Sequence, residues 1–159
     1  SVIIGDMDSI SEETKEKYQS LVIENSDQNT NDQTKAVNWA ISQGFSDVVI
    51  LGATGLREDH AIGNIALLAE YASSINVHSV SNNGVFTPIY GTTTFQSYKG
   101  QQVSIFSLTP HTAINSVNLK YPLQQLQLKS WWMGTLNEST ANNFTIDFVS
   151  GRCIVFQVF

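Results

Sequence analysis

The stretch V-I-I-G-D-M-D-S-I-S, residues 2–11, joins a short apolar run to a glycine and two carboxylates one residue apart. The apolar run at 2–4 is typical of a buried strand. Asp6 and Asp8 follow directly, and two carboxylates on one turn repel each other unless a cation lies between them. Mg²⁺ is a hard cation that prefers oxygen ligands. The stretch therefore predicts a strand of a parallel sheet that ends at a cation site.

The first half of the chain alternates segments typical of strands with segments typical of helices. Helices are expected at 11–20, 32–44 and 61–72, and strands at 2–4, 21–23, 47–51 and 76–82. Ser11 suits the N-cap of the first helix, and Gly44 suits the end of the second. The run D-V-V-I-L at 47–51 predicts a strand that is buried on both faces. Strands separated by helices of this length predict a parallel sheet with helical crossovers.

The second half has no helical periodicity and consists of short alternating runs separated by turn signals. Phe144, Ile146 and Phe148 alternate with other positions, as expected for a half-buried strand. Several short strands at this spacing favour an antiparallel sandwich or barrel. We therefore predict the α/β fold class, with a parallel-sheet α/β domain at 1–84 and an all-β sandwich domain at 85–159.

The composition is that of a globular protein, with 159 residues, 42% hydrophobic and 14% charged. The formal net charge of −6, with only 8 Lys and Arg, argues against a general nucleic-acid binder, which needs basic patches. No apolar run approaches the roughly 20 residues that cross a bilayer. The single Cys153 has no internal disulfide partner. The simplest expectation is a cytoplasmic protein with neither a nucleic-acid nor a membrane partner.

Three polar clusters each follow an expected strand. The clusters are Asp6, Asp8 and Ser9; Asp27, Gln28, Asn29, Asn31 and Asp32; and Gly52, Thr54, Gly55, Arg57, Asp59 and His60. Ligands of open parallel sheets bind at the carboxyl ends of the strands, so all three clusters are expected at one edge. This co-location indicates a binding site more strongly than any single cluster does.

The chemistry of the three clusters suits a polyphosphate. Four carboxylates are expected to converge and to need Mg²⁺, bound by one or two of them together with phosphate oxygens; they are Asp6, Asp8, Asp27 and Asp32. Gly52 and Gly55 let backbone amides approach phosphates, and Arg57 can hold a phosphate through a forked pair of hydrogen bonds. The chain has no G-x-x-x-x-G-K-[ST] motif, so it is not a P-loop enzyme. The pattern predicts the positioning and transfer of a phosphoryl group.

Several of these residues also have plainer interpretations. Asn31 has the residue type and position of a helix N-cap. Lys35 has the simple interpretation of a solvent-facing helix residue, and His60 that of a donor to a backbone carbonyl near a helix start. Trp39 is expected in the core rather than at a ligand.

Three ordered motifs resemble those of the thiamine pyrophosphokinase family. The segment G-D-M-D-S-I at 5–10 resembles the family signature G-D-[LM]-D-S. D-Q-N-T-N-D at 27–32 resembles D-Q-[DN]-x-T-D, and G-A-T-G-L-R-E-D-H at 52–60 resembles G-[AG]-x-G-x-R-x-D-H. Their order and spacing agree with the family, and so does the change from α/β to all-β near residue 84.

The resemblance implies an Mg²⁺-dependent enzyme with ATP as co-substrate. Members of the family transfer the pyrophosphoryl group of ATP to the hydroxyl of thiamine, which gives thiamine diphosphate and AMP. They have a catalytic α/β domain and a β-sandwich, and they form homodimers with the thiamine site between subunits. The fold and the partners expected from the resemblance are therefore a two-domain chain, ATP, thiamine and a second copy of the chain.

The resemblance also implies roles for individual residues. Asp6, Asp8, Asp27 and Asp32 would bind magnesium, and Asp6, Asp8, Asp32 and Arg57 would be catalytic. The nucleotide and phosphate site would be lined by Ser9, Gln28, Gly52, Thr54, Gly55, Arg57, Asp59, His60 and Asn64.

The expected thiamine site lies in the second half. The segment G-T-L-N-E-S at 134–139 resembles the family's G-x-S-N-[EV] segment, with Leu136 in place of a small hydroxyl residue. Thr135, Asn137 and Glu138 are the corresponding candidates. The ring of Trp131 or Trp132 has two open interpretations: it packs against the thiazolium or pyrimidine of thiamine, or it belongs to the core or an interface.

The sequence departs from the family pattern at two points. Asn31 stands where a threonine is usual, which affects one supporting contact of the site. The family also has an A-D-G-G-A motif in a segment ahead of the first strand, and this motif is not found here. We therefore expect that an N-terminal portion, with part of the nucleotide site, is absent from this sequence.

Three other functions share some of these features. A haloacid-dehalogenase-like phosphatase also places D-x-D after a strand, with the first Asp as a covalent nucleophile, but it needs a downstream Lys and an acidic pair that 52–60 does not resemble. A nucleotide-sugar transferase with a D-x-D metal site fits the later clusters less well. The third alternative is a non-catalytic module that binds nucleotide or thiamine, or a structural subunit. Clustered acids cost stability without a bound cation, which argues against a purely structural role.

Overall fold

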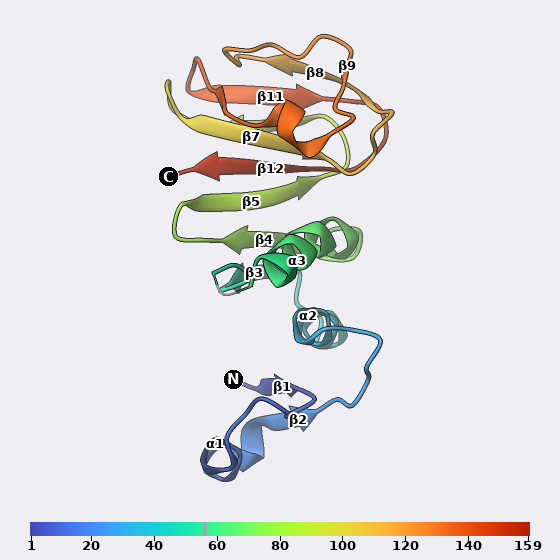
Figure 1. Cartoon of the computed structure of the whole chain (residues 1–159), viewed down its shortest axis with the longest axis vertical. Helices are drawn as coiled ribbons and strands as arrows, with labels where there is room; N and C mark the ends of the chain where they lie inside the picture. Colours follow the sequence, from blue (N-terminus) through green and yellow to red (C-terminus); the bar gives the residue numbers. More distant parts are fainter. Residues whose placement is uncertain (56) are drawn as a thin grey trace. The chain divides into compact units, whose positions relative to one another are not determined.

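The structure is a computed structural model that describes residues 1–55 and 57–159 (Figure 1). The chain divides into two compact units, Ser1–Val48 and Val49–Phe159, and each unit is described by itself. Residue 56, inside the expected segment 52–60, lies outside the described residues.

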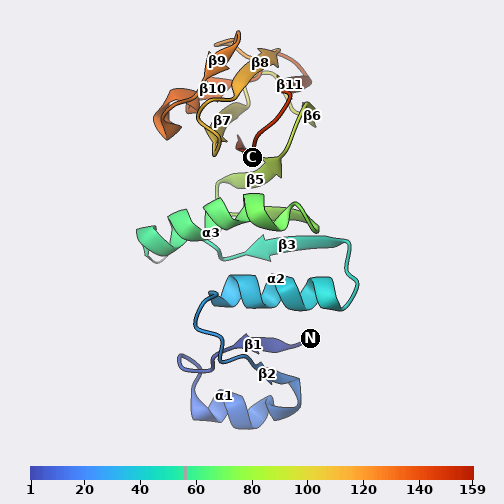
Figure 2. The same cartoon turned by 90° about the vertical axis from the view of Figure 1, so that its right-hand side faces the viewer.

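The first unit is a parallel strand pair with helices beside it. Its elements are β1 (Ile3–Gly5), α1 (Glu12–Lys17), the 3-10 helix η1 (Gln19–Leu21), β2 (Val22–Glu24) and α2 (Asp32–Ser42). β1 and β2 run parallel, with Ile3 opposite Val22, and α2 contacts β1. Figure 2 shows the strand pair between α1 and α2. The sequence expectation of a parallel sheet with helical crossovers is confirmed for this pair, with the second strand one residue later than expected.

The ends of both helices follow from local chemistry. Ser11 caps α1, since its Oγ accepts a hydrogen bond from the Thr14 amide at 3.2 Å. Asn31 caps α2 in the same way, with its Oδ1 2.9 Å from the Thr34 amide nitrogen. Gly44, just after α2, has φ +80°, the left-handed conformation that ends many helices. The expected caps and the expected helix end are confirmed.

The second unit contains a six-stranded sheet, ordered β10–β7–β12–β5–β4–β3, with one long helix against it. Its strands are β3 (Asp47–Leu51, which begins in the first unit), β4 (Asn76–Val80), β5 (Gly84–Ile89), β7 (Gln102–Ser107), β10 (Asn137–Glu138) and β12 (Cys153–Val158). The helix α3 (Glu58–Tyr71) contacts β4, β5 and β12. Leu68, Ala69 and Tyr71 are its buried residues, so its C-terminal half holds it on the sheet.

The expectation that the strand at 47–51 is buried on both faces is wrong. Among the described residues, β3 is the edge strand of the six-stranded sheet, next to β4. The side chains of Val49 and Leu51 are exposed by 61% and 73%. An apolar run indicates that a strand is extended, but its burial depends on what covers it.

A second sheet packs on the first to form a sandwich. The four-stranded sheet, ordered β6–β11–β8–β9, consists of β6 (Thr93–Gln96), β8 (Ala113–Val117), β9 (Leu126–Gln127) and β11 (Asn143–Asp147). The 3-10 helix η2 (Trp131–Gly134) lies beside β7.

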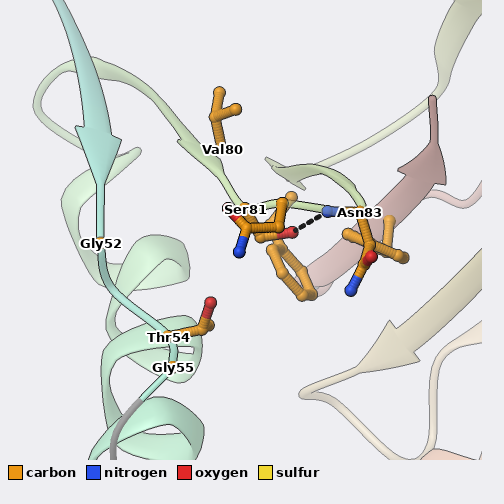
Figure 3. Close-up of a pocket in the computed structure, with 9 residues that line it drawn as sticks. Gly52, Thr54, Gly55, Val80, Ser81 and Asn83 are labelled. Carbon is orange, nitrogen blue, oxygen red and sulfur yellow. Dashed lines mark hydrogen bonds between the residues drawn. The ribbon is translucent and has the colours of Figure 1, made fainter.

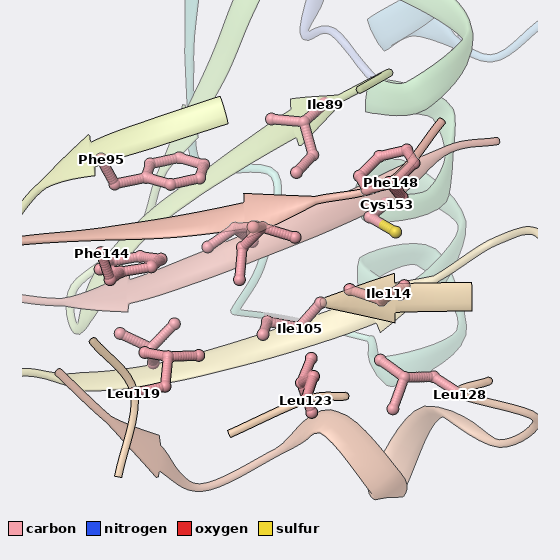
Figure 4. Close-up of a cluster of buried hydrophobic side chains, with 13 residues drawn as sticks. Ile89, Phe95, Ile105, Ile114, Leu119, Leu123, Leu128, Phe144, Phe148 and Cys153 are labelled. Carbon is pink, nitrogen blue, oxygen red and sulfur yellow. The ribbon is translucent and has the colours of Figure 1, made fainter. Parts of the chain in front are cut away.

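The sandwich core is filled by apolar side chains from both sheets (Figure 4). Phe95 of β6 stacks on Phe144 of β11, with ring centroids 4.9 Å apart, and Ile105 of β7 and Cys153 of β12 reach the core from the other sheet. Phe144 and Ile146 are fully buried, while Thr145 between them is only partly buried. The predicted alternation and the predicted sandwich are confirmed.

The six-stranded sheet continues across residue 84, where the sequence predicts a domain boundary. β4 and β5 run antiparallel, with Ser79 opposite Phe86 and Val80 opposite Val85. The chain passes from its first compact unit to its second between Val48 and Val49. The division into 1–84 and 85–159 stays a prediction. Among the helices of the described residues, none has the length and apolar character needed to cross a membrane.

Candidate active site

The turn after β1 holds Asp6 in a defined orientation. Met7 has φ +65°, a conformation that few non-glycine residues adopt, and its side chain is 9% exposed. This turn lets the Asp8 amide donate to Asp6 Oδ1 at 3.1 Å. The buried Met7 and this hydrogen bond together fix the direction of the Asp6 carboxylate.

A buried lysine joins the carboxylates that follow β1 and open α2. Lys35 is only 4% exposed, and its Nζ lies 3.2 Å from Asp32 Oδ1 and 3.9 Å from Asp6 Oδ2. We call Asp6, Asp32 and Lys35 the acid–lysine cluster. The interpretation of Lys35 as a solvent-facing residue is wrong, because its charge is removed from water and is compensated by two carboxylates.

Gly5 makes room for this cluster. A Cβ at Gly5 would lie 3.1 Å from Asp32 Oδ1 and 3.3 Å from its Cγ. These distances are tighter than ordinary van der Waals contact, so a side chain here would push Asp32 away. The glycine of the G-D-M-D-S segment is therefore explained by the close approach of α2 to the end of β1.

Asp27 is held by its own loop. Its Oδ1 accepts from the Asn29 amide at 2.9 Å and from Asn29 Nδ2 at 3.1 Å, and its Oδ2 accepts from Thr30 Oγ1 at 2.7 Å. The hydrogen bond from the Asn29 amide is the largest cause that lowers the pKa of Asp27, followed by that from Thr30. Asp27 therefore stays a carboxylate and orders the loop that leads to α2.

A hollow of about 320 Å³ lies beside the D-x-D turn. It is lined by Asp6, Met7, Asp8, Lys15, Gln19, Val22 and Glu24. Asp8, Ser9 and Gln28 are exposed. The hollow thus offers carboxylates and one lysine to a ligand at the end of β1.

The described residues offer Mg²⁺ part of a ligand shell. In residues 1–55 and 57–159, no group of three or more His, Cys, Asp and Glu side chains is arranged to hold a metal ion. Asp6 and Asp32 offer two hard carboxylates, and proteins commonly give one or two carboxylates to Mg²⁺, while phosphates and waters complete the shell. The donors therefore suit Mg²⁺ that arrives with a phosphate ligand. Asp8 and Asp27 do not join Asp6 and Asp32 in such a group.

The glycine loop after β3 has the backbone freedom that was expected of it. Gly52 and Gly55 have φ +72° and +123°. Asn64, on the second turn of α3, donates from Nδ2 to the Ala53 carbonyl at 3.1 Å and so ties the loop to the helix. Asn64 therefore holds the loop's backbone in place, and its predicted contribution to the nucleotide site stays a prediction.

Arg57 and Asp59 pair with each other at the start of α3. Arg57 Nη2 lies 2.6 Å from Asp59 Oδ2, and its Nε lies 3.1 Å from Oδ1. This forked pair is the largest cause that lowers the pKa of Asp59, followed by the His60 amide. Arg57, Asp59 and His60 are all exposed, so a ligand can reach them. The expected fork geometry of Arg57 is present, with a carboxylate as its partner.

A second hollow, of about 350 Å³, lies between the glycine loop and the turn that joins β4 to β5 (Figure 3). We call it the loop–turn hollow; it is lined by Gly52, Thr54, Gly55, Val80, Ser81, Asn82, Asn83, Phe86 and Phe156. The side chain of Thr54 points toward the turn that carries Ser81 and Asn83. Gly52, Thr54 and Gly55 of the sequence expectation therefore line one cavity.

In the sandwich, the two tryptophans differ in exposure. Trp131 packs edge-on against Phe106, with centroids 6.1 Å apart, and is 41% exposed. Trp132 is 75% exposed. Thr135 donates from Oγ1 to the Trp132 carbonyl at 2.8 Å, which closes η2. Trp132 is thus the more accessible ring for a ligand or partner.

Asn137 and Glu138 both have partners in the sandwich. Asn137 is 5% exposed; its Nδ2 donates to the Tyr121 carbonyl at 2.7 Å, and its Oδ1 accepts from the Tyr121 amide at 3.1 Å. Glu138 pairs with Lys120 at 3.1 Å. In this arrangement the Asn137 side chain ties β10 to the backbone of Tyr121.

The structure adds residues that the sequence pattern did not identify. Lys35 follows Asp32 by three residues on one helix, a spacing that places both on the same face. Ser81, Asn82 and Asn83 form a polar cluster after the strand β4, which is the same signal that identified the first three clusters. The aromatic wall of Phe86 and Phe156 gave no local signal in the sequence. The two residues are far apart along the chain and become neighbours only when β5 pairs with β12.

Two family models match the chain over consecutive parts. "Thiamin pyrophosphokinase, catalytic domain" matches residues 1–79, and "Thiamin pyrophosphokinase, substrate-binding domain" matches residues 84–156. Among curated proteins, thiamin pyrophosphokinase 1 of Caenorhabditis elegans is 25% identical over 170 residues, which cover 99% of this chain and 69% of that protein. Thiamine pyrophosphokinase 1 of Oryza sativa subsp. japonica is 40% identical over 82 residues, which cover 45% of this chain and 31% of that protein.

Solved structures agree with the fold. The crystal structure of thiamine pyrophosphokinase from Bacillus subtilis has a TM-score of 0.82 at 23% identity and covers 98% of this chain and 77% of that one. Thiamin pyrophosphokinase from Candida albicans has a TM-score of 0.79 at 18% identity, over 99% of this chain and 73% of that one. Both family models describe domains of thiamin pyrophosphokinase, and the two regions that they match follow each other along the chain. The chain belongs to the thiamin pyrophosphokinase family.

Proposed function

We propose that this chain transfers the pyrophosphoryl group of ATP to the hydroxyl of thiamine, in a reaction that depends on Mg²⁺ and gives thiamine diphosphate and AMP. The acid–lysine cluster carries the proposal, because it brings two carboxylates of the G-D-M-D-S and D-Q-N-T-N-D segments to the end of β1. Membership of the thiamin pyrophosphokinase family supports this pyrophosphoryl transfer.

Asp6 and Asp32 are proposed to hold Mg²⁺ together with phosphate oxygens. The motif resemblance also proposes Asp8 and Asp27, which the described residues do not place in one group with them. When bound, Mg²⁺ supplies positive charge to the triphosphate oxygens. Lys35 positions Asp6 and Asp32 by pairing with both, so both carboxylates are oriented around one side chain. This preorganisation reduces the rearrangement that the ligand would otherwise have to drive.

The phosphates are proposed to bind through the glycine loop and Arg57. Backbone amides of Gly52 and Gly55 are accessible to an anion, and the Arg57 fork suits a phosphate as well as it suits Asp59. The remaining proposed contacts of the nucleotide, which rest on the motif resemblance, are Ser9, Gln28, Thr54 and His60.

Thiamine is proposed to bind at the sandwich segment around η2. Trp132 offers an exposed ring for a cationic or aromatic group, and Thr135, Asn137 and Glu138 follow it. The family resemblance supports a homodimer with the thiamine site between subunits, and a cytoplasmic location.

The direct test is to incubate the protein with ATP, Mg²⁺ and thiamine and to measure AMP and thiamine diphosphate by chromatography. Equal amounts of both products, lost on addition of EDTA, are the expected result. Release of inorganic phosphate without thiamine would favour a phosphatase instead. Nucleotide binding without any product would favour a non-catalytic module.

A further inference from the structure

We propose that the loop–turn hollow binds the nucleoside part of ATP, with the adenine base recognised by Asn82 and Asn83 beside the Phe86–Phe156 ring pair. This inference rests on the proposed function and extends its nucleotide site to the turn between β4 and β5. None of these four residues belongs to the three motifs that the sequence pattern identified.

The charge of the hollow decides which part of the ligand it suits. Its nine lining residues are glycines, neutral polar residues and apolar residues, without one charged side chain. A triphosphate placed here would lose hydration without meeting a lysine or arginine, and a thiazolium cation would lose hydration without meeting a carboxylate. A neutral base with its ribose carries no such cost. The hollow therefore suits the uncharged end of the nucleotide.

The turn between β4 and β5 is fixed by one serine. The Ser81 amide and its Oγ both donate to the Gly84 carbonyl, at 2.9 and 3.1 Å, and the Ser81 Oγ accepts from the Asn83 amide at 3.3 Å. Figure 3 shows this last contact at the rim of the hollow. The backbone of the turn is thus set before any ligand binds, which lowers the entropy that binding would cost.

The two asparagine side chains at the turn are available to a ligand. Asn82 and Asn83 are exposed, and in the described part of the chain no hydrogen bond involves either side-chain amide. An asparagine amide presents a donor and an acceptor side by side, which matches the amino group and adjacent ring nitrogen of adenine. Guanine and hypoxanthine carry an oxygen in place of that amino group. At the edge formed by N6 and N7, one asparagine is therefore enough to favour adenine, because O6 and N7 of guanine and hypoxanthine are both acceptors.

The floor of the hollow offers aromatic rings. Phe86 and Phe156 lie opposite each other on β5 and β12, with ring centroids 4.3 Å apart and planes inclined by 34°. Gly84 keeps these strands close, since a Cβ there would lie 2.8 Å from Phe156 Cζ. Both rings are half-buried, so each retains an accessible part for a flat base. Any base can stack on such rings, so the side-chain amides of Asn82 and Asn83 must distinguish adenine from other bases.

The opposite wall suits the sugar and the first phosphate. Gly52 and Gly55 carry no side chain, and no described atom lies within 4 Å of where their Cβ would be. Their backbone is therefore open to a ligand that extends out of the hollow. A base at the turn and phosphates at the glycine loop place the nucleotide along one continuous path inside the second unit.

The test compares ATP with inorganic tripolyphosphate, which has the charge of the nucleotide's tail and no base. Dissociation constants are measured by calorimetry with Mg²⁺ present and thiamine absent, so no turnover is needed. For the double variant N82A/N83A, the dissociation constant of ATP is expected to rise about tenfold or more, while that of tripolyphosphate stays within twofold. Asn142→Ala, an exposed loop asparagine of the same unit, is the matched control and leaves both constants unchanged.

Base selectivity gives the second readout. The wild type is expected to bind ATP more tightly than ITP, and the double variant is expected to bind the two alike. Phe86→Leu, which keeps an apolar side chain on β5, is expected to weaken ATP and ITP equally. An unchanged dissociation constant for ATP in the double variant would overturn the proposal, as would an equal loss for ATP and tripolyphosphate.

The result is separable from the fate of the proposed function. Selective loss of ATP binding in a protein that forms no thiamine diphosphate would support the nucleoside site and refute the transferase. Transfer activity with a raised KM for thiamine and an unchanged KM for ATP in the double variant would overturn the nucleoside site and leave the transferase intact. That second outcome would assign the hollow to the aminopyrimidine ring of thiamine.

Discussion

Lys35 shows how one side chain organises the N-terminal unit. Its ammonium lies within 4.0 Å of two carboxylates, and only 2% of the side chain is exposed, whereas Asp32 is 55% exposed. Lys35 is therefore the buried member of the acid–lysine cluster, and its two carboxylates are the members that a ligand can reach. Removing it leaves two like charges close together, which raises the free energy of the folded state.

Substitution Lys35→Met is expected to lower the free energy of unfolding by about 2 kcal/mol in EDTA, because two partly exposed carboxylates lose the buried cation between them, a smaller loss than for a fully buried pair. Added Mg²⁺ is expected to recover more stability in this variant than in the wild type, since the ion replaces the lost positive charge. Thermal unfolding with and without Mg²⁺ measures both effects. Lys129→Met, at an exposed lysine of the sandwich, is the control. A loss that Mg²⁺ does not change would mean that Lys35 serves packing alone.

The Asp32→Asn variant is expected to lower kcat for thiamine diphosphate formation at least about 100-fold, because one charge of the proposed metal site is removed. The fold is expected to persist, since Asp32 is half exposed and the amide still hydrogen-bonds. Steady-state kinetics and circular dichroism check the two statements. Glu16→Gln, on the exposed side of α1, is the matched control and keeps wild-type turnover. Wild-type kcat in Asp32→Asn would remove this residue from the site.

At the scale of single elements, β4 carries an unusual buried hydroxyl. Ser79 is 1% exposed, and its Oγ has no hydrogen-bond partner among the described residues. Such a group loses hydration without compensation. Ser79→Ala is therefore expected to raise the free energy of unfolding by about 1 kcal/mol, as measured by urea titration.

The control for this prediction is another buried serine of the same sheet. Ser107 on β7 donates to the Thr109 carbonyl at 2.9 Å and accepts from its amide at 3.3 Å. Ser107→Ala is expected to destabilise by about 1 kcal/mol. If both substitutions shift stability in the same direction, the explanation by hydrogen bonding fails for Ser79.

Elements whose ends are set locally could be predicted from the sequence. Ser11 and Asn31 cap their helices through side chains three residues from the amides they bind, so the pattern contains the whole interaction. The alternation at Phe144 and Ile146 likewise encodes which face meets the core. These features need no knowledge of the rest of the chain.

Features that depend on distant neighbours could not be predicted in this way. The exposure of Val49 follows from the edge position of β3, which the apolar run does not encode. The burial of Lys35 follows from the packing of α2 on β1, whereas a lysine on a helix is usually solvated. The acid–lysine cluster and the loop–turn hollow were each found only in part for the same reason. Their motif residues could be read from the sequence, while Lys35 in the first and the Phe86–Phe156 pair in the second are brought in by tertiary contacts.

At the scale of the second unit as a whole, Cys153 reports on the integrity of the sandwich. The thiol is fully buried between the two sheets, and this burial raises its pKa from 9.0 to about 11. The folded state therefore keeps the proton in a range where the unfolded chain releases it. Stability is unaffected by this group below pH 9 and falls as the pH rises from 9 toward 11.

The expected slope from Cys153 is a loss of about 1.4 kcal/mol per pH unit between pH 9 and 11. Urea titrations over this range, compared between the wild type and Cys153→Ala, isolate it, because tyrosines and lysines contribute to both. The alanine variant is expected to show the shallower dependence. Identical slopes would mean that the thiol reaches solvent readily in the native protein.

The pairing of β4 with β5 has a mechanical consequence for the enzyme. The segment matched as catalytic ends at residue 79, the segment matched as substrate-binding begins at 84, and the two strands on either side of that junction are neighbours in one sheet. The two matched segments are therefore joined through main-chain hydrogen bonds between β4 and β5, and not by a flexible linker. Closure over a bound nucleotide cannot bend the chain here, and any opening motion must arise elsewhere.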